Sequence, residues 1–423
     1  MTELAQTSPT PTLLERVRAF LWAYRVPIAF GVAAFCVLAA FSGKRFLRQS
    51  KAPHFVYQAA AFLEGSLALP VDPPNQEDWA KVGEKIYVSF PAMPAAVMLP
   101  FVALWGYQFN DTSFTVVLGA LALLLFLLLL RRLSSDGDSK RGEWENLGFA
   151  AILGFGTVFF CCAIRGEVWF TAEVMGVGFT SLYLLFATRT RRPVLAGLLY
   201  AMATLTRTPL LFAGVFFLAE ALWPNGTLSL AEARTDLKPK LRKLGLFAAG
   251  AAPLALAHMA FNHARFGSIA EFGHRHLWNN RVNADIAKWG LFDYHYLERN
   301  LHAAFTRLPT LSWEPFKIGY DAHGMSLLVT TPLLLLLLWP KEKPRLHRAL
   351  WLTVACTALP GLFYQNDGYM QFGFRFSLDY TPYLLLLLAL GGWRMRGKLF
   401  ATLAVLGVVV NTWGALAFRG YSW

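Results

Sequence analysis

Long apolar runs recur from one end of the chain to the other, with short polar loops between them. A helix needs about 20 mostly apolar residues to cross the hydrocarbon core of a bilayer, so runs of this kind predict membrane-spanning helices. One longer stretch, 194–223, is interrupted by Arg207-Thr208-Pro209. Because proline disfavours a helical conformation at the residue before it, we expect two helices joined as a hairpin, with Arg207 near the outer surface. The predicted spans are 26–42, 113–131, 147–164, 169–187, 194–206, 209–223, 244–262, 325–340, 349–363, 377–392 and 399–417.

The segment 93–109 is apolar as well, but Pro94, Pro100 and Gly106 interrupt it. Basic loops guide its interpretation, because the cytoplasmic loops of membrane proteins are enriched in Lys and Arg. If 93–109 crossed the membrane, the N-terminus would lie outside. We expect this segment to stay at the interface, which gives eleven spans, a cytoplasmic N-terminus and an outer C-terminus. The basic loops that then share the cytoplasmic side are 131–146, 189–192, 224–243, 341–348 and 393–398.

Two long polar segments fall on the outer face under this topology. They are 43–92, the first outer loop, and 263–325, the second long outer loop, which holds six of the nine histidines. Within the first loop, apolar residues at helical spacing over 53–69 predict a helix that lies on the membrane surface. The pattern therefore predicts an all-α polytopic membrane protein in which residues 1–423 form a single domain.

The composition narrows the possible functions. Hydrophobic residues make up 56% of the chain and charged residues 15%, whereas soluble domains carry roughly 45–50% apolar and about 25% charged residues. A soluble globular enzyme, a disordered chain and a coiled coil are therefore excluded. The 39 Lys and Arg outnumber the 26 Asp and Glu by 13. In a membrane protein this excess marks cytoplasmic loops rather than nucleic-acid binding, and it favours anionic lipids or phosphate-bearing substrates.

Four short motifs stand in order along the chain. They are Gly83 to Pro94 (GEKIYVSFPAMP), Leu205 to Pro209 (LTRTP), Phe261 to Ser268 (FNHARFGS) and Gln371 to Asp379 (QFGFRFSLD). Together they resemble the bacterial GT-C glycosyltransferases of the protein O-mannosyltransferase and aminoarabinose transferase group (glycosyltransferase family 39-like). The resemblance implies a GT-C-like fold in the inner membrane, with a site that faces the periplasm or exterior. It also implies a polyprenyl-phosphate sugar donor and an inverting transfer to a lipid, glycan or protein acceptor.

The chain departs from this group at one position. Members usually carry an Asp just before the surface helix, whereas this chain reads Ser50-Lys51-Ala52-Pro53-His54. Either another acid takes the catalytic role, or the activity differs or is absent. The first outer loop offers Glu64, Asp72, Glu77, Asp78 and Glu84.

Two further acids lie where one predicted span turns into the next. Glu167 belongs to the short turn at 165–168, and Glu173 lies one turn into the following span. A carboxylate inside a span is costly, so it usually faces a cavity or a charged partner. We therefore consider Glu167 and Glu173 as catalytic candidates that could orient or deprotonate an acceptor hydroxyl. The alternative is that they pair with Arg165.

Cations near the outer face are candidates for binding a leaving phosphate. Lysine offers a point charge and tyrosine a hydrogen-bond donor, although both types also anchor helices at the interface. Asp379 lies four residues after Arg375, so the two could pair and hold the arginine ready for phosphate. The candidate substrate-binding residues are His54, Lys85, Tyr87, Arg207, Arg265, Arg375 and Asp379.

Cofactors stay open. The pair His274 and His276 could bind a metal if the chain there is extended, so a divalent metal is possible, although no metal ligand is assigned. Gly-rich phosphate loops, CxxC pairs and HExxH motifs are absent from the sequence. A transporter or flippase of lipid-linked or anionic substrates is the main alternative, with Arg207 and Glu173 lining its pathway, although internal repeats typical of such proteins are not visible. An O-antigen-type polymerase is a third possibility.

Overall fold

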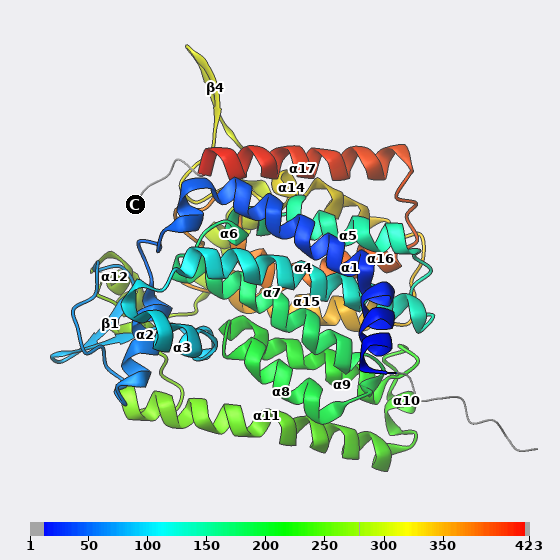
Figure 1. Ribbon diagram of the computed structural model, residues 1–423, viewed down its shortest axis with the longest axis horizontal. Helices are drawn as coiled ribbons and strands as arrows, with labels where there is room; N and C mark the ends of the chain where they lie inside the picture. Colours follow the sequence, from blue (N-terminus) through cyan, green and yellow to red (C-terminus); the bar gives the residue numbers. More distant parts are fainter. Residues whose placement is uncertain (1–11, 279, 419–423) are drawn as a thin grey trace, which may run out of the picture.

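The computed structural model describes residues 12–278 and 280–418, and it is a bundle of helices that lie side by side (Figure 1). Five helices within these residues are long and apolar enough to cross a membrane. They coincide with five of the predicted spans and establish a multi-pass helical membrane protein. These helices cover Leu21–Leu47, Asp111–Ser135, Val168–Thr190, Leu237–Phe266 and Lys398–Phe418.

The helices other than these five are shorter. In chain order, the α-helices of the described residues are α1 (Leu13–Ser42), α2 (His54–Leu63), α3 (Met93–Trp105), α4 (Asp111–Ser135), α5 (Glu143–Phe155), α6 (Phe159–Ala163), α7 (Val168–Ala187), α8 (Pro193–Thr204), α9 (Gly214–Leu222), α10 (Leu230–Arg234), α11 (Leu237–Phe266), α12 (Asn280–Trp289), α13 (Leu297–Leu301), α14 (Leu327–Thr330), α15 (His347–Leu362), α16 (Thr381–Leu390) and α17 (Lys398–Phe418). Two hairpins, which the all-α expectation did not include, are formed by β1 (Trp79–Val82) with β2 (Lys85–Val88) and by β3 (Thr310–Trp313) with β4 (Phe316–Gly319).

Six predicted spans form short or interrupted helices, so the count of eleven stays a prediction. The predicted span 147–164 is divided into α5 and α6. The break at Arg207 is confirmed: α8 ends at Thr204, and the 3-10 helix η4 (Thr208–Ala213) follows. Helix α3 has 13 residues, which at 1.5 Å per residue is about 20 Å. This is shorter than the hydrocarbon core of about 30 Å and agrees with a segment that does not cross.

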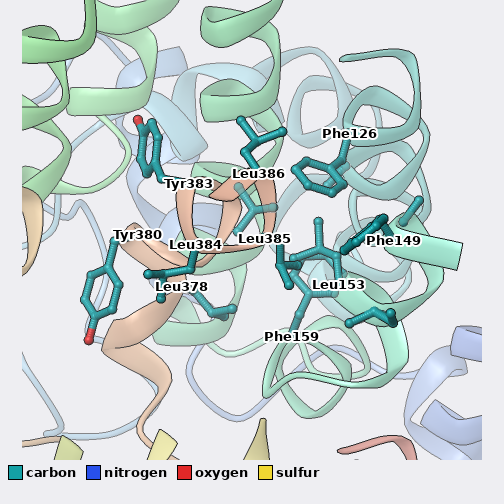
Figure 2. Packing of buried hydrophobic residues seen from close by; sticks show 14 of the residues in the cluster. Phe126, Phe149, Leu153, Phe159, Leu378, Tyr380, Tyr383, Leu384, Leu385 and Leu386 are labelled. Atoms are coloured by element: carbon teal, nitrogen blue, oxygen red, sulfur yellow. The ribbon is translucent and has the colours of Figure 1, made fainter. Parts of the chain in front are cut away.

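Helix α16 lies at the centre of the bundle, and all ten of its residues are buried. Figure 2 shows its leucines packed towards aromatic side chains of α4, α5 and α6. By contrast, α11 lies at the periphery against α8 (Figure 1). Two glycines permit this contact, because a Cβ at Gly197 would lie 2.0 Å from the Phe247 carbonyl oxygen and one at Gly250 2.0 Å from that of Val194. Small residues bring membrane helices into close contact in this way.

The two ends of the bundle are built differently. At one end, near α10 and the beginning of α1, the predicted basic loops meet (Figure 1). We call this the basic end. At the opposite end, the first and second long loops are joined by a β-bridge between Ala80 and Leu277, and the Trp278 N–H donates to the Trp79 carbonyl at 2.7 Å. We call this the loop end. Helix α17 ends here, so α1 starts and α17 stops at opposite ends, as an odd number of spans requires.

Helix α2 matches the helix predicted over 53–69 but ends earlier, at Leu63. Most of its residues are buried, since it packs against α3 and the hairpin strand β2. Helix α3 lies at the same end of the bundle and covers α2. Helix α2 is therefore more buried than a helix that rests on a membrane surface would be.

Candidate functional site

A cavity of about 460 Å³ opens at the loop end of the bundle. Both long loops line it, together with α7, the break at Arg207 and the segment 364–380. Four of the nine predicted site residues line this cavity, namely Glu173, Arg207, Arg375 and Asp379. The expectation that the two loops contribute to one site is therefore consistent with the geometry.

Arg207 lies in the break between α8 and η4, where the backbone is extended (φ −141°, ψ 114°). Its Nε and Nη2 donate to the two carboxylate oxygens of Asp379 at 2.9 and 2.7 Å. This two-point contact fixes the plane of the guanidinium. Gly176 of α7 provides room for the arginine, because a Cβ there would lie 3.0 Å from Arg207 Cγ.

Glu173 projects from the second turn of α7 and is fully buried at the floor of the cavity. Its Oε1 lies 3.2 Å from Nε of Arg375 and 4.0 Å from Nη2 of Arg207. Arg375 also donates through Nη1 to the Tyr369 carbonyl at 3.0 Å. Two arginines and two carboxylates, from α7, from the break and from the 3-10 helix η9 (Arg375–Asp379), thus form one buried cluster.

Arg375 and Asp379 do not form the expected ion pair with each other. Arg375 pairs with Glu173 and Asp379 pairs with Arg207 instead. The reason is the 3-10 geometry of η9. With about three residues per turn, positions four apart no longer share a face. Phe376 lies beside both guanidinium groups, at 5.6 Å from Arg207 and 5.3 Å from Arg375.

Both arginines retain binding capacity. Arg207 uses Nε and Nη2 for Asp379, and Arg375 uses Nε and Nη1 for the contacts above. Since a guanidinium carries five N–H donors, Nη1 of Arg207 and Nη2 of Arg375 remain outside these contacts. Both groups line the cavity, so a phosphate there could be bound by two cations whose positions are already set.

Asp78 is the carboxylate that the first outer loop contributes to the cavity, beside the more exposed Glu77. Its Oδ2 accepts a hydrogen bond from Trp169 Nε1 at 2.8 Å, and its carbonyl accepts one from Ser89 Oγ at 2.9 Å. Its φ of 55° is in the left-handed region, which is costly for a residue with a side chain. Such conformations concentrate at functional sites, where the surroundings enforce them.

Burial raises the pKa of Asp78 above its usual value, while the Trp169 hydrogen bond and the charge of Arg375 act in the opposite direction. A carboxylate in these surroundings holds a proton more readily than one in water. Unlike Asp379 and Glu173, which face arginines, Asp78 accepts from a tryptophan. Asp78 is therefore better suited than Asp379 or Glu173 to receive a proton from a substrate.

His54 supports this arrangement from outside the cavity. Its Nε2 donates to the Glu77 carbonyl at 2.8 Å, and its ring stacks on Trp79 at 3.7 Å between centroids. Burial lowers the pKa of His54 to about 4, so the ring is neutral at pH 7. His54 therefore holds the residues on both sides of Asp78, and its predicted role as a substrate contact stays a prediction.

The other predicted residues also lie outside the cavity lining. Glu167 accepts from Arg165 Nη2 and Nε at 2.6 and 3.0 Å, which is the alternative that the sequence left open. Arg265 donates to the Val88 carbonyl at 2.7 Å and Tyr87 packs edge-on against Phe266, so both join the first hairpin to the end of α11. Lys85 is exposed on β2.

His274 and Tyr364 add uncharged polar groups to the cavity. Burial, helped by the charge of Arg207, lowers the pKa of His274 to about 4, so the imidazole is neutral at pH 7. Its Nδ1 is buried without a hydrogen-bond partner in the described residues. Burial raises the pKa of Tyr364, which therefore keeps its proton. Both side chains can form hydrogen bonds with a polar ligand without adding charge.

A second polar cluster lies at the rim, where His323 and Asp367 also line the cavity. His323 Nδ1 lies 3.0 Å from Asp367 Oδ1 and 2.8 Å from the Gly368 carbonyl. Both partners only accept, so Nδ1 carries the proton and Nε2 is left as an acceptor in the neutral ring. Arg307 holds Asp367 from the other side at 3.3 Å.

The described residues contain no group of three or more His, Cys, Asp or Glu placed to hold a metal ion. Within the cavity, Glu173 and Asp379 already face arginines, and His274 and His276 do not form a pair because His276 stacks on Phe266. The donor set therefore fits a divalent cation poorly, and no chemical step is assigned to one.

Sequence reasoning did not single out Asp78, His323 or Asp367. Asp78 stood among five first-loop acids, and no motif distinguished it from Glu77. His323 and Asp367 are 44 residues apart and meet only through tertiary folding. His274 was considered only as half of a metal-binding pair.

No family model and no curated protein matches this chain. Solved structures that align with it include the oligosaccharyltransferase of Archaeoglobus fulgidus in the apo form and the archaeal oligosaccharyltransferase AglB from Archaeoglobus fulgidus in complex with an inhibitory peptide and a dolichol-phosphate. Each covers 92% of this chain at 12% identity with a TM-score of 0.49. This chain spans 55% of the length of those proteins. The chemistry of the cavity, rather than this similarity, supports the proposal that follows.

Proposed function

We propose that the chain is an integral membrane glycosyltransferase that moves a sugar from a polyprenyl-phosphate donor to a lipid, glycan or protein acceptor on the outer face. The observation that carries the proposal is the cavity at the loop end, where two ion-paired arginines line the same space as Asp78, a first-loop carboxylate that accepts from Trp169. A lipid-linked phosphate sugar needs cations at its leaving group and a proton acceptor at its attacking group. The cavity supplies both.

The phosphate of the donor binds Arg207 and Arg375 through the nitrogens that their carboxylate partners leave available. Fixed cations stabilise the charge that develops on the phosphate as the glycosidic bond breaks. Asp379 and Glu173 act as positioning residues, because they hold the two guanidinium groups in place before the substrate arrives.

Asp78 receives the proton of the attacking hydroxyl. The acceptor oxygen bonds to the anomeric carbon from the face opposite the phosphate, the bond from that carbon to the phosphate oxygen breaks, and the polyprenyl phosphate leaves with the electron pair. Asp78 thereby takes the role that the empty position at Ser50-Lys51-Ala52-Pro53-His54 leaves open. Glu173 also lines the cavity, with its charge compensated by arginine.

A transfer assay separates this proposal from the alternative of a transporter or flippase. Purified protein in sealed proteoliposomes would be incubated with a panel of polyprenyl-phosphate sugars and with lipid, glycan and peptide acceptors. Release of polyprenyl phosphate together with glycosylated acceptor is the expected result, and an Asp78→Asn variant provides the blank. Movement of the intact donor across the bilayer, with no product from any member of the panel, would favour the transporter.

The outer orientation is tested in cells. Glu77 lines the cavity and is exposed, and His302 is an exposed residue of the second long loop. Cysteines placed at either position should react with an impermeant thiol reagent in intact cells. Protection of both until the cells are opened would put the cavity on the cytoplasmic side.

A further inference from the structure

The hairpin of β3 and β4 projects sideways from the loop end, beside the C-terminal end of the spanning helix α17 (Figure 1). All four residues of β3 are exposed, and so are the first three of β4. The hairpin thus receives little support from the body of the protein on either face.

The register divides the hairpin into two unlike faces. Leu311 pairs with Ile318 and Trp313 with Phe316, and since side chains alternate along a strand, these four share one face. Their exposed fractions are 56, 52, 74 and 59%. The opposite face carries the alternate pairs of Thr310 with Gly319 and of Ser312 with Lys317.

An isolated two-stranded hairpin is marginally stable in water, and this one would expose four large apolar side chains. The apolar face therefore needs a covering, and its position indicates which one. The hairpin leaves the body where exposed apolar side chains of α17, such as Val409 and Leu416, mark a surface that faces lipid. Phe305 and Leu308 are exposed as well and continue the apolar surface into the hairpin.

The side chains suit the boundary between lipid and water. Tryptophan and other aromatic residues are enriched at that level, and the apolar face carries Trp313 and Phe316 without any charge. Lys317 projects from the opposite face, where its ammonium can stay in water or contact lipid phosphates. On the apolar face, a protein partner would find four apolar side chains and no charge.

We propose that this hairpin lies flat in the interface of the outer leaflet, with Leu311, Trp313, Phe316 and Ile318 in the lipid and Ser312 and Lys317 towards water. Its bilayer contact has a consequence for the cavity. The hairpin is inserted between Arg307 and His323, the two residues that hold Asp367 at the rim. Anchoring the hairpin therefore fixes the rim of the cavity at the lipid surface. This inference does not depend on the proposed catalytic activity.

Spin labels on the full-length chain in liposomes test the proposal. Single cysteines would replace Trp313, Phe316, Ser312 or Lys317, one at a time, so that at least three of the four apolar residues always remain. Cys36 and Cys356 would first be changed to serine, because the other two cysteines are buried. Collision with oxygen, which concentrates in lipid, and with a water-soluble nickel chelate is then measured for each label.

Labels at positions 313 and 316 should collide mainly with oxygen, and those at 312 and 317 mainly with the chelate. The alternation between 312 and 313 is the matched control, since the two positions are adjacent in sequence. Chelate access at all four positions would place the hairpin in water and overturn the proposal. Labels at 313 and 316 that meet neither reagent would show instead that a second copy or another protein covers the apolar face.

Discussion

The two ends of the bundle use the same ion-pair chemistry for different purposes. At the basic end, Asp138 accepts from Arg189 at 2.8 Å and from Arg345 at 3.2 Å, while Glu220 accepts from Arg345 at 2.6 Å. These contacts tie three loops and α9 together. At the loop end, Arg207 and Arg375 are held in the same manner, but their guanidinium groups also line a cavity.

The difference shows how to separate function from stability in this protein. An arginine whose partners are other loops closes the structure, and its loss should weaken folding. An arginine that is fixed by a carboxylate and still faces a cavity is prepared for a ligand, and its loss should weaken activity more than folding.

The largest effect is expected for Asp78→Asn. Asparagine keeps an oxygen for the Trp169 N–H but cannot take a proton, and a base of this kind contributes typically about 10²–10⁴-fold to a rate. The rate of sugar transfer at saturating donor should fall by that factor, with donor binding retained. Asp72→Asn is the matched control, because Asp72 is an exposed acid of the same loop, and equal losses in both variants would contradict the assignment.

The pH profile sharpens the same prediction. Asp78 works in its ionised form, so activity should fall as the pH drops through its pKa. Because burial raises that pKa, the decline should start at a higher pH than for an exposed aspartate. The profile of kcat/KM for the wild type should contain this acid limb, and the residual activity of Asp78→Asn should lack it.

Arg207→Lys should lower activity by roughly 10- to 100-fold, since a hydrogen bond to a charged group is worth about 1.5–3 kcal/mol and lysine cannot span both oxygens of Asp379. Arg207→Leu should abolish transfer. Because that change also leaves Asp379 buried without its partner, the double variant Arg207→Leu with Asp379→Asn provides a folded comparison. If all three transferred sugar at the wild-type rate, Arg207 would be a structural residue only.

The two acids beside α7 should respond differently. Glu173→Gln removes the charge that is ion-paired with Arg375 and should reduce transfer by about 10-fold, the equivalent of about 1.4 kcal/mol. Glu167→Gln disturbs a pair with Arg165 that lies outside the cavity lining, so it should affect melting temperature more than turnover of the folded protein. A reversed pattern, measured on purified variants, would move the site towards Glu167.

At the basic end, Arg345→Ala should reduce stability and leave the chemistry intact. The change leaves the buried carboxylate of Glu220 without its Arg345 partner. Removing one partner of a buried ion pair costs ~3–5 kcal/mol. We expect the low end of that range because the arginine is 21% exposed. A lower melting temperature in detergent with unchanged turnover per folded molecule would support the contrast. Loss of turnover without loss of stability would contradict the contrast between the two ends of the bundle.

The smallest effect is expected at the rim. His323 lines the cavity and can accept a hydrogen bond from the sugar acceptor through Nε2. Loss of this one neutral hydrogen bond, worth roughly 0.5–1.5 kcal/mol, in His323→Gln should raise KM for the sugar acceptor by about 10-fold or less, with little change in kcat. His295 pairs with Asp293 outside the cavity, which makes His295→Gln a matched control. An equal change in KM for both variants would exclude a rim contact with the acceptor.

The helices were predictable because a segment in lipid must satisfy its backbone hydrogen bonds internally and must carry apolar side chains. The break at Arg207 was predictable from Pro209. The partners of the arginines were not, because Asp379 is 172 residues from Arg207 and a helical spacing rule fails in the 3-10 helix η9. The hairpin of β3 and β4 did leave a signal, since Leu311 and Trp313 alternate with polar residues.

Asp78 could not be predicted as a site residue from the sequence. Its neighbours Asp72 and Glu77 have the same chemistry and belong to the same loop. Asp78 differs from these two acids in its left-handed backbone conformation and in the hydrogen bond that it accepts from Trp169, 91 residues away in the sequence. Both depend on the packing of the first loop against α7, which no local pattern specifies.

The central claim is that the loop end binds a lipid-linked phosphate through Arg207 and Arg375, and equilibrium binding of a polyprenyl monophosphate tests it most directly. The wild type, Arg207→Lys, Arg375→Lys and Arg345→Lys would be compared as folded proteins in nanodiscs. We predict that both loop-end variants bind at least about tenfold more weakly, the equivalent of about 1.4 kcal/mol, and that Arg345→Lys binds as the wild type does. Equal affinity in all four proteins would contradict the account.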